Sequence, residues 1–187
     1  MFFDIGIGLL VATIFGVATG SESPLLLLGI GVAGALWPDL DFSIWLARHK
    51  KVDHLAHRHR DLLHRPLALM PPLTLVVWLA LGWQAGALFG ITTVLHFIHD
   101  TIGHGWGIKW LWPLNNHYWC FRSFGGRPVR LYAWTLAEQD ELPEKYGNRN
   151  WAKEVYSLSS PNLKKELYVL SVGVLVATAW CASTFLS

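Results

Sequence analysis

The chain has 187 residues, a length that fits one domain, but only 15% of them are charged and 52% are apolar. This low charge and the eleven tryptophans are not typical of a soluble domain. The formal net charge is only +2 and no basic stripe alternates with aromatic residues, so nucleic acid is not expected as a partner.

Three apolar blocks predict the helices of a membrane protein. The first, Ile5–Pro38, is interrupted by the turn-like GSESP at residues 20–24, and the second, Pro66–His99, by GWQAG at residues 82–86. The third block is Leu167–Leu186. A spanning helix needs roughly 20 apolar residues, with about 17 tolerated. Each early block is therefore predicted to form a hairpin of two short helices, and the third a single span.

The expected fold is all-α, an integral membrane helical bundle of about five hydrophobic helices with a polar site at its cytoplasmic face. We expect a membrane-embedded metal-site domain at residues 1–115, an interfacial or cytoplasmic subdomain at residues 116–166, and a C-terminal transmembrane helix at residues 167–187. The cluster WLWPLNNHYWCF, residues 110–121, is typical of an aromatic belt at headgroup depth.

The basic residues predict the orientation. All Lys and Arg fall in residues 48–65 and 109–165, the two connections between the apolar blocks. If both early blocks are hairpins, both connections emerge on one side, which the positive-inside rule makes cytoplasmic. We therefore expect a multi-pass protein of the inner (cytoplasmic) membrane, with its N-terminus and polar site on the cytoplasmic side. His54 and His57 are expected to be solvated among the headgroups.

Three polar clusters lie at the ends of these hairpins. WPDLDF (residues 37–42) ends the first hairpin, HRHRDLLHRP (57–66) leads into the second, and HFIHDTIGHG (96–105) closes it. The predicted topology brings all three to one membrane face. His96 and Asp100 are four residues apart, so on a helix they differ by about 40° and face the same way. Asp39 and Asp41 are expected to point the same way from an extended stretch, although aspartates after a helix also act as caps.

The clusters supply six candidate metal ligands, all with nitrogen or oxygen donors: Asp39, Asp41, His59, His64, His96 and Asp100. This set suits one or two Zn²⁺ ions, with Mn²⁺ or Fe²⁺ as alternatives. A metal ion with an open position activates water for hydrolysis. Arg60 and Arg65 could clamp a phosphate, and Asp61 is a candidate general acid.

In this order, over residues 1–115, the motifs resemble the YdjM-like family of inner-membrane-associated metal-dependent hydrolases. The family is distantly akin to zinc-dependent phospholipase C and single-strand nucleases. Its PD-hydrophobe-D motif corresponds to Asp39 and Asp41, and its HR-x-x-x-H motif to His59, Arg60 and His64. Its H-x-x-x-D motif corresponds to His96 and Asp100, and its W-P motif to Trp112 and Pro113. Members commonly carry a histidine before the first helix, where this chain has Asp4, so Asp4 is an extra candidate ligand. Arg65 stands where a small hydroxyl residue is frequent.

Residues and resemblance together predict a membrane-bound metal-dependent hydrolase that uses metal-activated water at the cytoplasmic interface. The expected substrate and partner is a phosphoester in a membrane lipid or a lipid-linked phosphate. An alternative is a non-catalytic metal-binding or metal-transport membrane protein, but transport predicts ionisable residues deep within several helices. A third hypothesis is a scaffold whose polar cluster is a structural ion network and whose residues 116–165 dock a partner.

Overall fold

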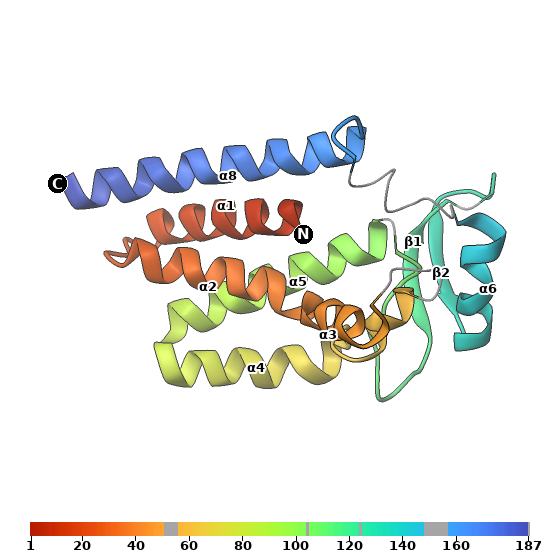
Figure 1. Cartoon of the computed structure of the whole chain (residues 1–187). Helices are drawn as coiled ribbons and strands as arrows, with labels where there is room; N and C mark the ends of the chain where they lie inside the picture. Colours follow the sequence, from red (N-terminus) through yellow and green to blue (C-terminus); the bar gives the residue numbers. More distant parts are fainter. Residues whose placement is uncertain (51–55, 104, 124, 148–156, 187) are drawn as a thin grey trace. The chain divides into compact units, whose positions relative to one another are not determined.

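The computed structural model describes residues 1–50, 56–103, 105–123, 125–147 and 157–186, and these are mostly helical (Figure 1). Contacts divide the chain into two compact units, which are described separately below. The first unit holds the described residues of Met1–Trp37, Pro72–Leu95 and Val155–Ser187, and the second those of Pro38–Pro71 and His96–Glu154.

The first unit is a bundle of apolar helices. It contains α1 (Phe2–Ala18), α2 (Pro24–Leu36), α8 (Pro161–Leu186), the later part of α4 (Pro66–Leu81) and the earlier part of α5 (Trp83–Ile102). Helix α1 packs against both α2 and α8 (Figure 1). The two helical pairs predicted from the apolar blocks are confirmed: GSESP separates α1 from α2, and Gly82, with a φ of +89°, separates α4 from α5.

Small residues let these helices approach closely. A Cβ on Gly8 of α1 would lie 2.7 Å from the carbonyl oxygen of Gly31 in α2, and a Cβ on Gly6 would lie 2.7 Å from the backbone of α8. Close backbone contact through small residues is how helices associate in membranes, where the hydrophobic effect does not drive them together. By contrast, a Cβ on Gly29 of α2 would meet nothing within 4 Å.

Among the described residues, three helical segments are long and apolar enough to cross a membrane: Pro24–His49, Trp83–Ile102 and Pro161–Leu186. Helices α1 and α4 are apolar but shorter. The structure therefore confirms five apolar helices, while the number of spans stays a prediction, as does the division at residues 115 and 166. Helix α8 begins at Pro161 rather than at the predicted Leu167, because the polar residues before Leu167 continue the helix.

The second unit carries shorter elements around the polar clusters. They are α3 (Leu40–His49), the 3-10 helix η2 (Ala56–Asp61), the strands β1 (Tyr118–Arg122) and β2 (Arg130–Trp134), and α6 (Leu136–Tyr146). The strands pair antiparallel, with Phe121 opposite Leu131. A purely all-α fold is thus wrong for this segment: Cys120 and Tyr132 point to one side of the hairpin, where Trp106 and Trp134 pack on them. Helix α6 begins with a capping box formed by Thr135 and Glu138.

Candidate metal centre

The first cluster lies at the start of α3. Pro38 cannot donate a backbone hydrogen bond, so α2 ends at Leu36 and a 3-10 turn, η1 (Trp37–Asp39), leads into α3. Asp39 occupies the N-cap position without a side-chain cap hydrogen bond, and Asp41 lies in the first helical turn. The extended stretch expected here is wrong, because the turn joins the helix directly. Residues two apart on a helix do not face each other, so the two carboxylates diverge.

The second cluster places His64 in the link between η2 and α4. Pro66 occupies the first position of α4, where its missing N–H costs nothing, and it keeps the residue before it out of the helical conformation. The link is held by the backbone N–H of Leu63, which donates to Oδ2 of Asp41 at 3.0 Å. His64 is fully buried as a result of this folding.

The third cluster is the end of α5. His96 and Asp100 lie one helical turn apart, and Nε2 of His96 is 3.7 Å from Oδ2 of Asp100. The prediction that these two side chains share a face is confirmed. Trp110 holds this end of the helix by donating from Nε1 to Oγ1 of Thr101 at 2.7 Å.

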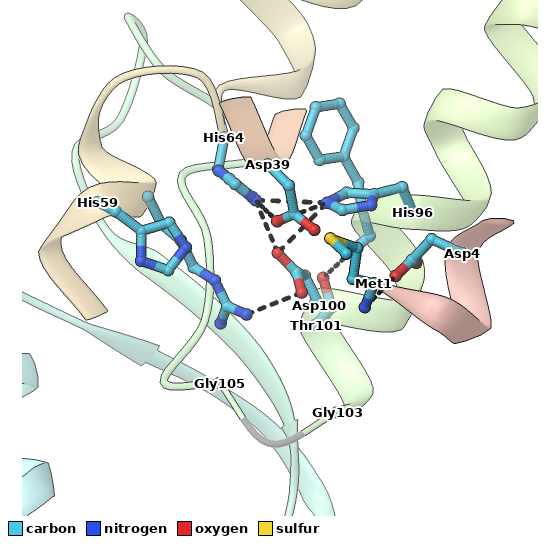
Figure 2. Close-up of polar contacts among 12 residues, drawn as sticks. Met1, Asp4, Asp39, His59, His64, His96, Asp100, Thr101, Gly103 and Gly105 are labelled. Carbon is cyan, nitrogen blue, oxygen red and sulfur yellow. Dashed lines mark hydrogen bonds and ion pairs between the residues drawn. The ribbon is translucent and has the colours of Figure 1, made fainter. Parts of the chain in front are cut away.

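Four ligand atoms from the three clusters converge (Figure 2). Nε2 of His64 lies 2.8 Å from Oδ2 of Asp100, 3.4 Å from Nε2 of His96 and 3.8 Å from Oδ1 of Asp39. Nε2 of His96 also lies 3.8 Å from Oδ1 of Asp39. The second unit alone provides all four side chains. Side chains 61 residues apart in the sequence, Asp39 and Asp100, thus line one point.

These separations fit a single ion. Ligands about 2.0–2.2 Å from zinc at tetrahedral angles are roughly 3.3–3.6 Å from one another. The separations given above run from 2.8 to 3.8 Å and bracket that range. The ligand atoms of His64, His96 and Asp100 all lie within 4.8 Å of one another, and Oδ1 of Asp39 lies 3.8 Å from both imidazole nitrogens, so small side-chain adjustments would place an ion among them.

Burial and charge favour the same interpretation. His64, His96 and Asp100 are buried, whereas the side chain of Asp39 is 28% exposed. Buried charges are costly unless they are paired or coordinate a metal. With neutral imidazoles, the carboxylates of Asp39, Asp41 and Asp100 and the guanidinium of Arg60 carry a net charge of −2, which a divalent cation balances.

Asp41 contacts the other side of the His64 ring. Its Oδ2 lies 3.0 Å from Nδ1 of His64, which leaves Nε2 directed at the cluster. Its Oδ1 is buried and has no hydrogen-bond partner among the described residues. Burial opposes the charged form of His64, but the hydrogen bonds to Asp100 and Asp41 outweigh it and raise the pKa to about 9. Without an ion, a proton therefore occupies His64, and protons and metal compete for it.

His59 forms a second group of potential ligands with Asp39 and His64, whose ligand atoms all lie within 4.8 Å of one another. Its Nδ1 donates to the carbonyl oxygen of Ala56 at 2.5 Å, which leaves Nε2 as the ligand atom. Burial, followed by the charge of Arg60, lowers the pKa of His59 to about 4. The ring is therefore neutral at physiological pH, as a metal ligand must be.

The predicted anion-binding arginines have partners of their own. Nη2 of Arg60 donates to Oδ1 of Asp100 at 2.8 Å, so this guanidinium holds the oxygen that does not face His64. Gly105 gives Arg60 its room, because a Cβ there would lie 1.5 Å from Nη1. The guanidinium of Arg65 stacks over the ring of Trp112 at 4.2 Å, in the W-P motif.

Asp61 binds the hairpin. Its Oδ1 accepts a short hydrogen bond from the hydroxyl of Tyr118 and lies 3.1 Å from Nζ of Lys109. Lys109 also lies over the Tyr118 ring at 4.6 Å. These contacts attach η2 to β1; the role of Asp61 as a general acid stays a prediction.

Sequence reasoning missed a further attachment of η2. Arg58 donates from two nitrogens to both oxygens of Asp140 in α6, and Nε2 of His57 lies 3.2 Å from Oδ1 of Asp140. The expectation of a solvated His57 is wrong, because this residue is buried and its ring lies against α6. His54 lies outside the described residues. Partners more than 80 residues apart leave no local signal in the sequence.

Asp4, the extra candidate ligand, belongs to α1 of the first unit. It is buried, and its Oδ2 lies 3.0 Å from the N-terminal nitrogen of Met1. Its role as a ligand stays a prediction.

Comparison with protein families identifies the chain over most of its length. A family model described as YdjM inner membrane protein matches residues 4–183. No curated protein and no solved structure matches the chain.

Proposed function

We propose a function for a chain that belongs to the YdjM inner membrane protein family: a membrane-bound, metal-dependent hydrolase of phosphoesters. The observation that carries this proposal is the convergence of two imidazole nitrogens and two carboxylate oxygens at separations close to those of a tetrahedral site. All four donors are nitrogen or oxygen, and no thiolate takes part, as in catalytic rather than structural zinc sites.

Each residue then has a defined task. His64, His96, Asp39 and Asp100 would hold the ion, with Zn²⁺ as the preferred metal. Asp41 fixes the ring of His64 and keeps its Nδ1 protonated, because a carboxylate at this nitrogen selects that tautomer. His59, whose Nε2 is available, is the candidate for a second ion or for a contact with substrate.

Four protein ligands fill a tetrahedral site, so water would bind as a fifth ligand or in place of Asp39, the most exposed of the four. An ion with such an open position would lower the pKa of that water to about 7 and supply hydroxide at neutral pH. Arg60 keeps Asp100 in place, and its remaining N–H donors are those that would bind a phosphoryl oxygen. Asp39 is the most exposed of the four ligands, so substrate would enter from its side.

The substrate class follows from the membrane setting. A site at the polar end of apolar helices is accessible to the phosphate of a lipid or a lipid-linked molecule. Six of the basic residues lie in residues 48–65 and the other nine in residues 109–165, which supports a cytoplasmic position for both connections and for the site. That position requires α1 and α4 to cross or re-enter the membrane with their partners. Labelling of single cysteines from either side would test it.

The function is tested by turnover in the reconstituted full-length protein. We expect zinc-loaded protein to hydrolyse a phosphomonoester or phosphodiester, tested with a chromogenic aryl phosphodiester, phosphatidate and a polyprenyl phosphate. Stripping the metal with a chelator should abolish turnover, and zinc should restore it.

The matched variants are His96→Ala and His117→Ala. His117 is a histidine of the same unit whose Nδ1 lies against Asn115. Removing a residue that only hydrogen-bonds to a metal ligand costs roughly 10–100-fold in activity. His96→Ala removes a ligand itself, so its hydrolytic activity should fall by more than that, while His117→Ala should keep the wild-type activity. Zinc-loaded protein that binds the ion but hydrolyses none of these substrates would contradict the hydrolase and favour the non-catalytic metal-binding protein.

A further inference from the structure

Two arginines lie directly opposite each other on the β-hairpin. Arg122 of β1 and Arg130 of β2 are register partners at one end of the sheet. Partners in an antiparallel pair point to the same face, with Cβ atoms about 4.5–5.5 Å apart, and like charges placed there destabilise the sheet. The hairpin therefore contains an unfavourable charge pair, and an anion between the two guanidiniums would relieve it.

Ring contacts show where the two guanidiniums lie. The guanidinium of Arg130 lies 4.8 Å from the ring centre of Tyr132, and that of Arg122 lies 5.6 Å from the ring centre of Trp106. Trp106 and Tyr132 belong to the same cluster on the buried face of the hairpin. A ring contact uses the flat face of a guanidinium, whereas its N–H donors point outward in its plane. Both cations are therefore held at one edge of the same aromatic cluster.

Hydrogen bonds to the backbone fix Arg122. Its Nη1 donates to the carbonyl oxygens of Gly103 and Gly105, at 3.3 and 3.2 Å, in the link that follows α5 (Figure 2). The side chain is partly buried, and burial lowers its pKa because it disfavours the charged form. A fixed, partly desolvated guanidinium gains more from a neighbouring anion than a solvated one does. Arg130 is exposed, so an anion can reach the pair from solvent.

The chain around the pair supplies no acidic side chain of its own. Residues 101–137, which include the whole hairpin, contain no Asp or Glu. Two carboxylates from neighbouring segments have other partners. Asp61 accepts from Tyr118 at the opposite end of β1, four residues or about 13 Å along the strand, and Asp140 accepts from Arg58. The field at the arginine pair is therefore positive and favours an anionic ligand.

Gly105 connects this pair with the candidate metal centre. A Cβ on Gly105 would lie 1.5 Å from Nη1 of Arg60, and its carbonyl oxygen accepts from Nη1 of Arg122. Across a single residue, these two contacts put the two nitrogens no more than about 8 Å apart. Arg60 in turn donates to Asp100. The arginine pair thus lies beside the guanidinium that holds one of the candidate metal ligands.

We propose that Arg122 and Arg130 form a binding subsite for a phosphate group, carried by a lipid headgroup or by a soluble molecule. The two guanidiniums donate hydrogen bonds to its oxygens, and its negative charge offsets the repulsion between the strands. The subsite uses none of the four candidate metal ligands. In the hydrolase proposed above, on which this catalytic role rests, the subsite would hold a phosphate of the substrate other than the one that reacts.

The test measures binding rather than turnover, so its result does not depend on the hydrolase. Inorganic phosphate is titrated by calorimetry into the full-length, metal-free protein in a neutral detergent, against chloride at the same ionic strength. Arg130→Gln removes one cation of the pair. Arg127→Gln, which removes an exposed basic side chain from the turn of the same hairpin, is the matched control. Unfolding temperatures show that each variant is folded.

Wild type and Arg127→Gln should bind phosphate with affinities within about twofold of each other, and Arg130→Gln should bind at least about tenfold more weakly. Equal losses in the two variants would overturn the proposal, because they would indicate attraction by net charge alone. Wild-type protein that binds no phosphate would overturn it too.

A second variant tests whether the two side chains face each other. Arg130→Glu and Arg130→Gln both lose the ring contact with Tyr132, but only glutamate pairs with Arg122 across the strands. Arg130→Glu should therefore unfold at a higher temperature than Arg130→Gln and bind no phosphate. An unfolding temperature no higher than that of Arg130→Gln, or retained phosphate binding, would overturn the subsite.

The source of the phosphate is found by competition. Micelles that contain phosphatidate are compared with micelles that contain phosphatidylcholine, in the presence of bound inorganic phosphate. Displacement by phosphatidate alone supports the subsite and assigns a lipid headgroup to it. Phosphate that stays bound in both micelles supports the subsite and assigns a soluble phosphate, whereas equal displacement by both lipids would overturn recognition of the phosphate group.

Discussion

Replacing Asp41 by asparagine separates two roles for this carboxylate. The sequence suggests a metal ligand, and the buried Oδ1 without a hydrogen-bond partner among the described residues is compatible with that. The geometry instead places Oδ2 on Nδ1 of His64, which is the position of a carboxylate that orients a metal-binding imidazole. The two roles predict different losses of metal affinity.

The size of the loss can be worked out from the contacts. Oδ2 accepts two hydrogen bonds of 3.0 Å, from Leu63 N–H and from Nδ1 of His64. The asparagine side chain keeps one oxygen acceptor and the same shape, but it replaces a charged acceptor, worth about 1.5–3 kcal/mol per bond, with a neutral one worth about 1 kcal/mol. Removal of an outer-sphere partner costs roughly 10–100-fold in metal affinity. That range corresponds to about 1.4–2.7 kcal/mol, and it overlaps the upper part of the change of about 0.5–2 kcal/mol expected for the His64 bond.

The assay is a zinc competition titration against a chromophoric chelator, with the full-length protein in detergent. Asp41→Asn should bind zinc roughly 10–100-fold more weakly than the wild type, and His64→Ala should bind far more weakly than either. Unfolding temperatures of the metal-free proteins show whether a variant still folds. A wild-type affinity in folded Asp41→Asn would refute the orienting role, and a loss equal to that of His64→Ala would make Asp41 a direct ligand.

Three further predictions concern the fold. Gly8→Val should break the contact between α1 and α2 and lower the yield of monodisperse protein, measured by size-exclusion chromatography. Gly29→Val, where a Cβ meets nothing within 4 Å, should leave that yield unchanged. The hydrogen bonds from Arg58 lower the pKa of Asp140 below its ordinary 3.8. The ionised carboxylate therefore stabilises the fold above pH 3.8, and this contribution is lost as the pH falls through the folded-state pKa. Asp140→Asn should therefore cost less than about 1 kcal/mol at pH 7, and the difference from the wild type in thermal unfolding should shrink as the pH is lowered below about 4. Thr135→Ala removes the N-cap of α6 and should cost about 0.5–2 kcal/mol in the same thermal assay; no change would mean that α6 unfolds separately.

The helices and one ligand pair could be predicted because their signals are local. Runs of apolar residues with turn sequences between them determined the helical pairs, and the spacing of His96 and Asp100 determined their shared face. Asp39 and Asp41 were assigned to the correct cluster but with the wrong backbone. Whether a stretch after Pro38 continues as a helix depends on what the chain packs against, which neighbouring residues do not reveal.

The hairpin was not predicted because its residues fit two interpretations. An aromatic run such as residues 110–121 is typical of a membrane interface, and the same side chains have high β propensity. Only pairing with residues 130–134 decides between them, and that pairing is a tertiary contact. The contacts of Asp61 with Tyr118 and of His57 with Asp140 could not be predicted for the same reason.

The central claim is that side chains from three distant segments bind one divalent ion. Elemental analysis of the purified full-length protein, after zinc loading and removal of free metal, measures this directly. We expect at least one ion per wild-type chain and per His117→Ala chain, and much less in His96→Ala and Asp100→Asn. Folded wild-type protein without a retained ion, or His96→Ala with as much metal as the wild type, would contradict the account.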